Sequence, residues 1–307
     1  ALKNSLSGCH NFAAGACALC SNWGGCYNNA LGYVALAANT TGKWNNAMGA
    51  YTLCSNTTGC HNTALGYLAL CSNTTGYNNT AIGQLGLCSN TTGTHNNAIG
   101  GENILRVNTT GSYNTGIGNG ALCGNTTGDY NTAIGSSALQ NALSGCENFA
   151  AGYYALKNNW GGCYNNAIGT QALCTNTTGN YNTAIGYIAL HSNTTGGCNN
   201  AIGSTALRYN TTGDYNQAIG DSALKCNTTG DANNAIGCAA LQNNTTGENN
   251  FAGGSSTLKN NKTGDYNVAL GYATMNDNVV GSYNNAMGFL SLYAGTSGNY
   301  NNAFGQY

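Results

Sequence analysis

The stretch "GNTTGDYNTAIGSSAL", Gly124–Leu139, recurs along the whole chain with a few letters changed, and it decides the fold. Aligned against itself, the sequence has a period of 17 residues with the consensus A-L-x-x-N-T-T-G-x-Y-N-[NT]-A-I-G-x-x. Eighteen repeats and one residue inserted near Asn103 account for all 307 residues. The repeats, whose positions we number 1 to 17, begin at Ala1, Ala18, Ala35, Thr52, Ala69, Gly86, Ile104, Ala121, Ala138, Ala155, Ala172, Ala189, Ala206, Ala223, Ala240, Thr257, Thr274 and Ser291.

Three positions of the repeat are invariant: positions 8 and 15 are always Gly, and position 11 is always Asn. Position 2 is Leu in every repeat but one, where it is Met275. Two glycines per repeat indicate two backbone corners. Gly is needed at a corner where φ is positive or where another segment of the backbone approaches closely. The segments N-[NT]-A-I and A-L then predict two short strands. This pattern fits one coil of a parallel β-solenoid, with coils roughly 4.8 Å apart. A helical solenoid is excluded because an i, i+3, i+4 apolar stripe is missing.

A covariation between positions 12 and 14 suggests which side chains point inward. A Phe at position 12 accompanies a small residue at position 14, as expected if both fill one volume. The three pairs are Phe12 with Ala14, Phe149 with Ala151, and Phe251 with Gly253. Because residues i and i+2 share a strand face, we expect positions 12 and 14 inside, together with the Leu of position 2. Positions 11 and 13, Asn and Ala, are then expected to face outward, against another chain.

A longer period is superposed on the 17-residue one. The first two repeats recur as the ninth and tenth, so an eight-repeat unit of about 137 residues is duplicated. We therefore expect a single continuous array over residues 1–307, with superunits 1–137 and 138–273 and a partial unit 274–307. The last residues would join the first in phase, which predicts a piece of a longer fibre or a unit that stacks end to end.

The segments "YNTAIGSSAL" and "GYNNTAIGQLGL" resemble two groups of known proteins. One is the Asn-x-x-Ala-Ile-Gly repeats in the heads of trimeric autotransporter adhesins. The other is the "NTAIG…AL…NTTG" arrays of phage tail-fibre and surface proteins. The resemblance covers all the repeats and implies a left-handed parallel β-roll, three chains around one axis, and a passive fibre role. It also implies that the N-x-[TNF]-A-[IL]-G segments line the roll and face the trimer axis.

Composition argues against several function classes. A net charge of −1 gives no electrostatic footprint for nucleic acid, and no apolar run approaches the length of a membrane span. Acidic residues are scattered, and His10, His61 and His95 share position 10 with Tyr, so they are expected in an aromatic column rather than in a metal or acid/base site. We expect no catalysis, no cofactor and no metal.

N-glycosylation sequons occupy position 5 in most repeats. They are Asn39, Asn56, Asn73, Asn90, Asn108, Asn125, Asn176, Asn193, Asn210, Asn227, Asn244 and Asn261. These residues are candidate acceptors if the chain passes through a glycosylating compartment. The alternative is that Asn caps backbone groups at the turn before Gly. Asn22, Asn159 and Asn278 keep the Asn without a sequon, which favours the structural alternative.

Fifteen cysteines fall largely on positions 3 and 9. Cys54, Cys71 and Cys88 occupy position 3 of three consecutive repeats, at about the Cα separation that a disulfide requires. They are a candidate disulfide ladder in an oxidising compartment. The alternative is a stacked column of free thiols.

Three functions follow from these patterns. The leading hypothesis is a non-catalytic structural fibre on a cell, a virion or an extracellular filament, with further copies of itself as partners. The second is an adhesin whose repeat surface binds glycans or a host receptor through its Tyr columns and the apolar corners Trp23, Trp160, Leu6 and Leu143. Ice binding is a minor alternative, because the adjacent Thr of positions 6 and 7 are expected to point in opposite directions.

Overall fold

A computed structural model describes residues 7–307, which contain eighteen parallel strands and fall into two compact units that divide between Ala150 and Ala151. The first unit contains β1 (Phe12–Ala14), β2 (Asn29–Leu31), β3 (Asn46–Met48), β4 (Thr63–Leu65), β5 (Thr80–Gln84), β6 (Asn97–Glu102), β7 (Thr115–Ile117) and β8 (Thr132–Ile134). β9 (Phe149–Ala151) includes the division between the units, which therefore does not fall at the 137/138 boundary of the expected superunits. The second unit contains β10 (Asn166–Ile168), β11 (Thr183–Ile185), β12 (Asn200–Ile202), β13 (Gln217–Ile219), β14 (Asn234–Ile236), β15 (Phe251–Gly253), β16 (Val268–Leu270), β17 (Asn285–Met287) and β18 (Asn302–Phe304).

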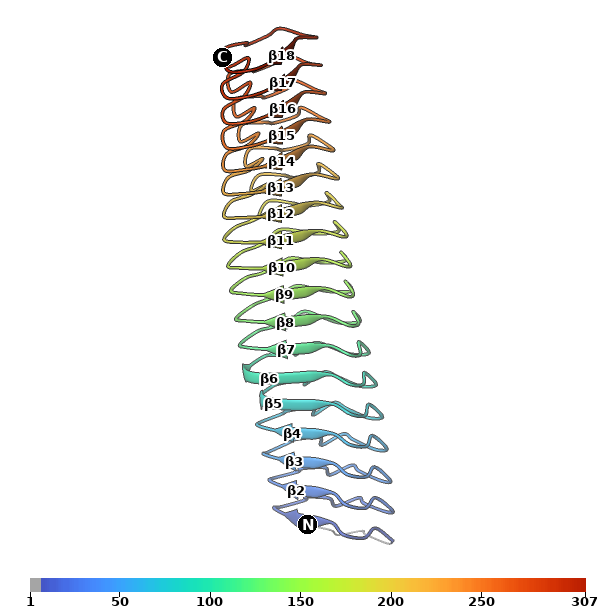
Figure 1. Cartoon of the computed structure of the whole chain (residues 1–307). Helices are drawn as coiled ribbons and strands as arrows, with labels where there is room; N and C mark the ends of the chain where they lie inside the picture. Colours follow the sequence, from blue (N-terminus) through green and yellow to red (C-terminus); the bar gives the residue numbers. More distant parts are fainter. Residues whose placement is uncertain (1–6) are drawn as a thin grey trace. The chain divides into compact units, whose positions relative to one another are not determined.

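Each unit is a β-solenoid whose coils are the 17-residue repeats, as the sequence predicts. Within a unit each strand pairs in parallel with the strand one coil further on, as in the register Asn29↔Asn46, and the strands lie one above another (Figure 1). The inserted residue is absorbed where β5 meets β6, at a register shift between Ile82 and Gln84. A one-residue insertion thus forms a local bulge and leaves the following coils in phase.

The two invariant glycines make the two predicted corners for different reasons. At position 15 the backbone has positive φ, for example +142° at Gly32, a conformation that strains other residues. At position 8 the cause is crowding. A Cβ on Gly76 would lie 2.5 Å from the Gly93 carbonyl oxygen and 3.0 Å from Asn90 Nδ2. Any larger residue at position 8 would therefore push apart two successive coils.

The prediction of a second strand at A-L is wrong. Leu36 has φ of +51°, and the same left-handed conformation recurs at position 10, as in Trp44, and at position 17, as in Val34. A Leu in this conformation cannot continue an extended strand. Its amide still donates to the next coil, since Leu36 N bonds the Thr52 carbonyl at 3.0 Å. The coil therefore has one strand, and the A-L segment adds a turn that is also hydrogen-bonded from coil to coil.

The predicted orientation of the strand is also wrong. Ala of position 13 and Asn of position 11 are buried, for example Ala133 and Asn131 at 0% exposure, whereas Ile134 of position 14 is 41% exposed. The interior of a coil consists mainly of Ala and Leu from positions 1 and 2, Asn from positions 5 and 11, and Ala from position 13. The coil is too narrow for a larger set, so the large residue of the strand must point outward.

Asparagine side chains connect the coils inside this narrow core. Asn79 Oδ1 accepts the backbone N–H of Asn96 at 3.0 Å, and Asn79 Nδ2 donates to the Gly93 carbonyl at 2.8 Å. The same bonds recur at position 11 along both units. A buried amide must have its donors and acceptors satisfied, and here its partners belong to the next coil. This explains why position 11 is always Asn.

Candidate functional site

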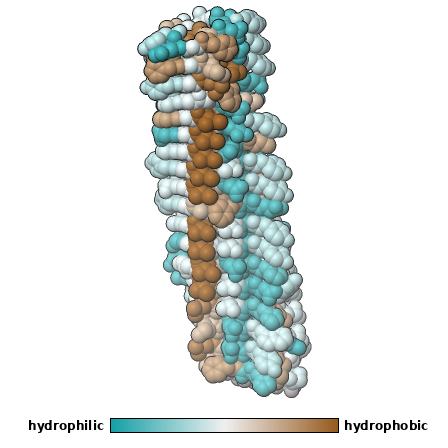
Figure 2. All heavy atoms as spheres, in the orientation of Figure 1, coloured by the Kyte–Doolittle hydropathy of each residue, from teal (hydrophilic) through white to brown (hydrophobic). Residues whose placement is uncertain are grey.

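The outer side of the strands carries a column of large apolar side chains at position 14, which we call the ridge. It comprises Leu31, Met48, Leu65, Ile82, Ile99, Ile117 and Ile134 in the first unit, and Ile168, Ile185, Ile202, Ile219, Ile236, Leu270, Met287 and Phe304 in the second. Most of these side chains are exposed, from 36% at Ile185 to 75% at Phe304. Figure 2 shows apolar side chains gathered in a column along the visible face, with polar side chains on either side.

Phenylalanine maintains the ridge where position 14 is small. A Cβ on Gly253 would lie 2.6 Å from Leu270 Cδ2 of the next coil and 3.3 Å from Phe251 Cε1, so both side chains occupy the space that a larger residue would fill. The predicted exchange of volume between positions 12 and 14 therefore involves the next coil as well, through the Leu270 side chain. It takes place on the outer face of the strand, however, where Phe12 is 57% exposed.

The twelve sequon asparagines lie inside the coil, each with 0% exposure. Asn73 Nδ2 donates to the Gly76 carbonyl and to Asn56 Oδ1 of the preceding coil, both at 2.9 Å. These bonds confirm that Asn caps the turn before Gly. Because both amide hydrogens are bonded in the interior, attaching a sugar would require the side chain to leave the core.

The three cysteines of the candidate ladder lie in one column as free thiols. The Sγ atoms of Cys71 and Cys88 are 3.3 Å apart, while Cys54 Sγ donates to the Cys71 carbonyl at 3.3 Å. The hydrogen bond from Cys71 and the charge of Arg106 lower the pKa of Cys88 to about 7. The hydrogen bond with Cys71 and burial raise the pKa of Cys54 far above its ordinary value. A disulfide in this column stays a prediction.

The aromatic residues of position 10 stack ring over ring along the outside of the coils, which confirms the predicted column. In the first unit the ring centroids of Tyr113 and Tyr130 are 4.8 Å apart with an interplanar angle of 4°. In the second unit those of Tyr164 and Tyr181 are 4.9 Å apart at 1°. Within each stack the ring faces cover one another, whereas Tyr130 and Tyr181 each end a stack and keep one face open.

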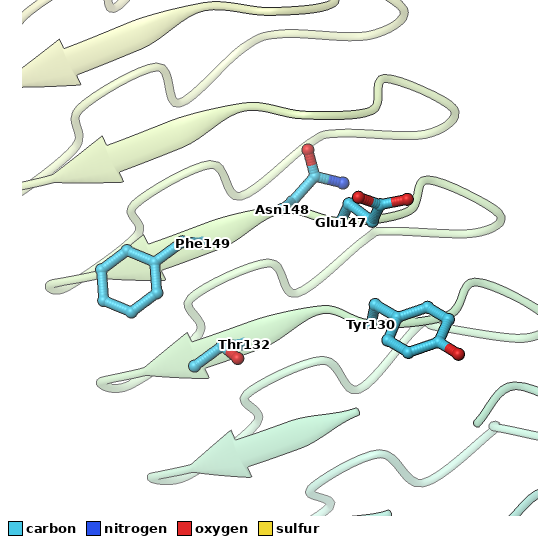
Figure 3. Close-up of a pocket in the computed structure, with 5 residues that line it drawn as sticks. All are labelled: Tyr130, Thr132, Glu147, Asn148 and Phe149. Carbon is cyan, nitrogen blue, oxygen red and sulfur yellow. The ribbon is translucent and has the colours of Figure 1, made fainter. Parts of the chain in front are cut away.

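Clefts open at two of the interruptions of the aromatic column. One of about 470 Å³ lies where Glu147 replaces the aromatic residue, and Figure 3 shows the rings of Tyr130 and Phe149 at its two ends with Thr132 between them. A second, of about 300 Å³, lies where Cys198 replaces the aromatic residue, between Tyr181 and Tyr215. The sequence predicts the column, and the signal for the two clefts is the non-aromatic residue at position 10, Glu147 or Cys198.

The apolar corners are exposed as expected of a contact surface, with Trp23 at 57%, Trp160 at 53% and Leu143 at 47%. Leu6 lies outside the described residues. Threonines of position 6 do not form a free outer column, because hydroxyls such as that of Thr40 donate to the next coil, here to the Thr57 carbonyl at 3.0 Å.

Residues 7–307 contain no group of three His, Cys, Asp or Glu side chains placed to hold a metal ion. Over the same residues there is no helix of the length and apolarity that crossing a membrane requires. No known family model, curated protein or solved structure matches the chain significantly.

Proposed function

We propose that the chain is a non-catalytic structural component of a fibre outside the cell, on a cell surface or on a virion. In this proposal three copies associate side by side through the ridge. The ridge is the observation that carries the proposal. Rows of neighbouring, exposed large apolar side chains are unusual on a monomeric protein and mark interaction surfaces.

The spacing of the ridge favours another copy as the partner. Successive ridge side chains, such as Ile117 and Ile134, belong to directly paired strands and therefore repeat at the strand spacing of roughly 4.8 Å. A partner can match every one of them only if its own surface repeats at that spacing. A second copy of this chain has such a surface by construction.

Charge does not oppose this association. The eight basic and nine acidic residues of the chain nearly balance, so copies brought together along their length do not repel one another strongly. The small outer side chains at position 12, such as Thr115 and Thr132, leave the apolar side chains of position 14 standing above them. Burial of the ridge in an interface would then be driven by the hydrophobic effect.

The proposal is tested by a triple substitution of Ile99, Ile117 and Ile134 to Thr. Thr keeps the branched side chain that suits a strand and removes apolar surface from three adjacent coils. We expect the unaltered protein to sediment at three times the 31.3 kDa chain mass and the triple variant to shift toward one chain.

The control variant carries Ser at Asn97, Thr115 and Thr132, which lie on the same three strands but outside the ridge. We expect it to keep the trimer, and circular dichroism checks that both variants retain the β-solenoid. A monomeric unaltered protein, or a triple variant that remains trimeric, would contradict the proposal. Deletion of residues 138–273 distinguishes a spacer from an adhesive whose binding surface is spread over all repeats. A spacer should become shorter and still associate.

A further inference from the structure

The interruption of the aromatic column at Cys198 leaves two tyrosine faces bare. Tyr181 stacks on Tyr164 on one side and faces the gap on the other. Tyr215 has Cys198 and Ala232 as its column neighbours, and among the described residues no aromatic ring stacks on it. The two side chains are accordingly 60% and 65% exposed, more than Tyr113 at 46% within a complete stack.

The gap has the height of one missing ring. Tyr181 and Tyr215 are two coils apart, so their rings are separated by roughly 9.6 Å, twice the strand spacing. A ring that entered midway would lie about 4.8 Å from each, within the range in which ring faces attract one another. In the complete part of the column the chain fills the same place with its own side chain, as Tyr283 does 5.1 Å from Tyr300.

The rim of the cleft offers both hydrogen-bond donors and acceptors. Asn180 Oδ1 accepts the Cys163 N–H at 2.7 Å, which leaves the Asn180 amide hydrogens as donors. Asp214 Oδ1 accepts the Gly197 N–H at 2.6 Å, which leaves its second oxygen as an acceptor. The Thr195 side chain also lines the cleft, and no Lys or Arg lies among the described residues that line it.

We propose that this cleft binds a pyranose ring of a carbohydrate, held between Tyr181 and Tyr215. A pyranose has C–H faces that pack on aromatic rings and a hydroxyl edge that both donates and accepts hydrogen bonds. A purely aromatic guest would leave the rim of Asn180, Thr195 and Asp214 without partners. An organic cation would use the carboxylate and the ring faces but not the amide hydrogens. Binding here goes beyond the fibre role and does not require it.

Cys198 reports on this cleft directly, because its exposed thiol stands where the ring would enter. The experiment measures the rate at which iodoacetamide alkylates Cys198 in the intact protein, by mass spectrometry of the peptide. Cello-, chito-, xylo- and manno-oligosaccharides are the probes, and choline is the comparison cation. Exposed Cys238, at position 16 of a later repeat in the same unit, is the internal control.

At a ligand concentration ten times the Kd, the cleft is free about one-tenth of the time. We therefore expect the alkylation of Cys198 to slow about tenfold and that of Cys238 to stay unchanged. Tyr215→Ala removes one wall and should abolish the protection without disturbing the core, since that side chain is exposed. Ala232→Tyr covers only the opposite face of Tyr215 and should leave the protection intact.

Three results would overturn the proposal. The first is that no oligosaccharide of the panel protects Cys198. The second is that choline protects it and the saccharides do not, which would assign the cleft to organic cations. The third is that protection survives in Tyr215→Ala or extends equally to Cys238, which would place the saccharide elsewhere.

Discussion

The two sides of each strand differ in what they tolerate. On the inner side, position 11 is Asn throughout and position 13 is Ala except at Gly116. On the outer side, position 12 accepts Asn, Thr, Phe, Gln and Val, and position 14 accepts residues from Gly to Phe. The inner side chains contact the next coil through buried amides and methyl groups. The outer side chains are not enclosed by the chain, and position 12 varies in size and polarity while position 14 stays mostly large and apolar.

Large apolar residues alone do not hold the core of the coil together. Each typical coil contributes one large apolar side chain, the Leu of position 2, whereas two of its buried side chains are asparagines. Their hydrogen bonds, such as Asn90 Nδ2 to Asn73 Oδ1 at 2.9 Å, run from coil to coil. Register is therefore fixed by amide geometry as well as by apolar burial, and a substitution inside should cost far more than one outside.

The sharpest test of this difference uses two neighbouring glycines. A Cβ on Gly25 would collide with the Gly42 carbonyl oxygen and Asn22 Oδ1, and would lie 2.7 Å from Asn39 Nδ2. The nearest atom to a Cβ on adjacent Gly24 is Ser7 Oγ at 3.5 Å. We expect Gly25→Ala to lower the free energy of unfolding by more than about 4 kcal/mol, and Gly24→Ala to change it by less than about 0.5 kcal/mol.

Chemical denaturation followed by circular dichroism measures both variants. If the two substitutions changed the free energy of unfolding equally, the interior at this corner would be able to relax around an added Cβ. The inner and outer sides would then not differ in what they tolerate.

The period, the parallel solenoid and the two glycine corners could be predicted from the sequence because each leaves an invariant residue type at a fixed spacing. The orientation of the strand could not be predicted from size alone. The rule that large apolar residues lie inside fails because the coil is too narrow to enclose Ile134.

A signal for the correct orientation was present in one repeat. Ile104 replaces Ala at position 1 in the repeat where Gly116 replaces Ala at position 13, and a Cβ on Gly116 would lie 2.7 Å from Ile104 Cγ2. This exchange of volume marks positions 1 and 13 as inner neighbours. The interruptions of the aromatic column are visible in the sequence as Glu147 and Cys198 at position 10, but the volume and the lining of the clefts come only from the folded coils.

The cysteine side chains of position 3 are half-buried, so they belong fully to neither the inner nor the outer side of the coil. We expect their reactivity to differ from coil to coil. With a pKa of about 7, Cys88 is about half ionised at pH 7, whereas a thiol with the ordinary value of 9.0 is about 1% ionised. We expect iodoacetamide to alkylate Cys88 at pH 7 roughly 5-fold faster than an ordinary thiol, because the roughly 50-fold larger thiolate fraction is partly offset by the lower nucleophilicity of a low-pKa thiolate, and we expect Cys54 hardly to react. The Cys88 rate should rise with pH around a midpoint near 7.

The lowered pKa of Cys88 also determines how the stability of the protein depends on pH. Because the folded-state pKa of Cys88 is lowered, its ionisation contributes stability above the ordinary pKa of 9.0, and this contribution is lost as pH falls through about 7. Cys71→Ala removes the principal hydrogen bond and should move the midpoint of alkylation upward. An unchanged midpoint in that variant would assign the shift to Arg106 alone.

The smallest effect we predict is a gain, at the one place among residues 7–150 where the Asn ladder of position 5 is broken. Ala142 occupies position 5 and is fully buried, and Asn125 Oδ1 of the preceding coil is buried without a hydrogen-bond partner. Asn at position 142 would donate to that oxygen, as Asn125 Nδ2 does to Asn108 Oδ1 at 2.8 Å. We expect Ala142→Asn to raise the free energy of unfolding by about 1 kcal/mol, the net value of a hydrogen bond to a buried group.

Ala142→Leu is the matched control, because it fills space without supplying a donor. Repeating Ala142→Asn in an Asn125→Ala background completes a double-mutant cycle, in which the gain should disappear. If Ala142→Asn still raises the free energy of unfolding in the Asn125→Ala background, the gain arises from packing and not from the hydrogen-bonded ladder. Buried amides would then contribute less to the stability of the inner side than we infer.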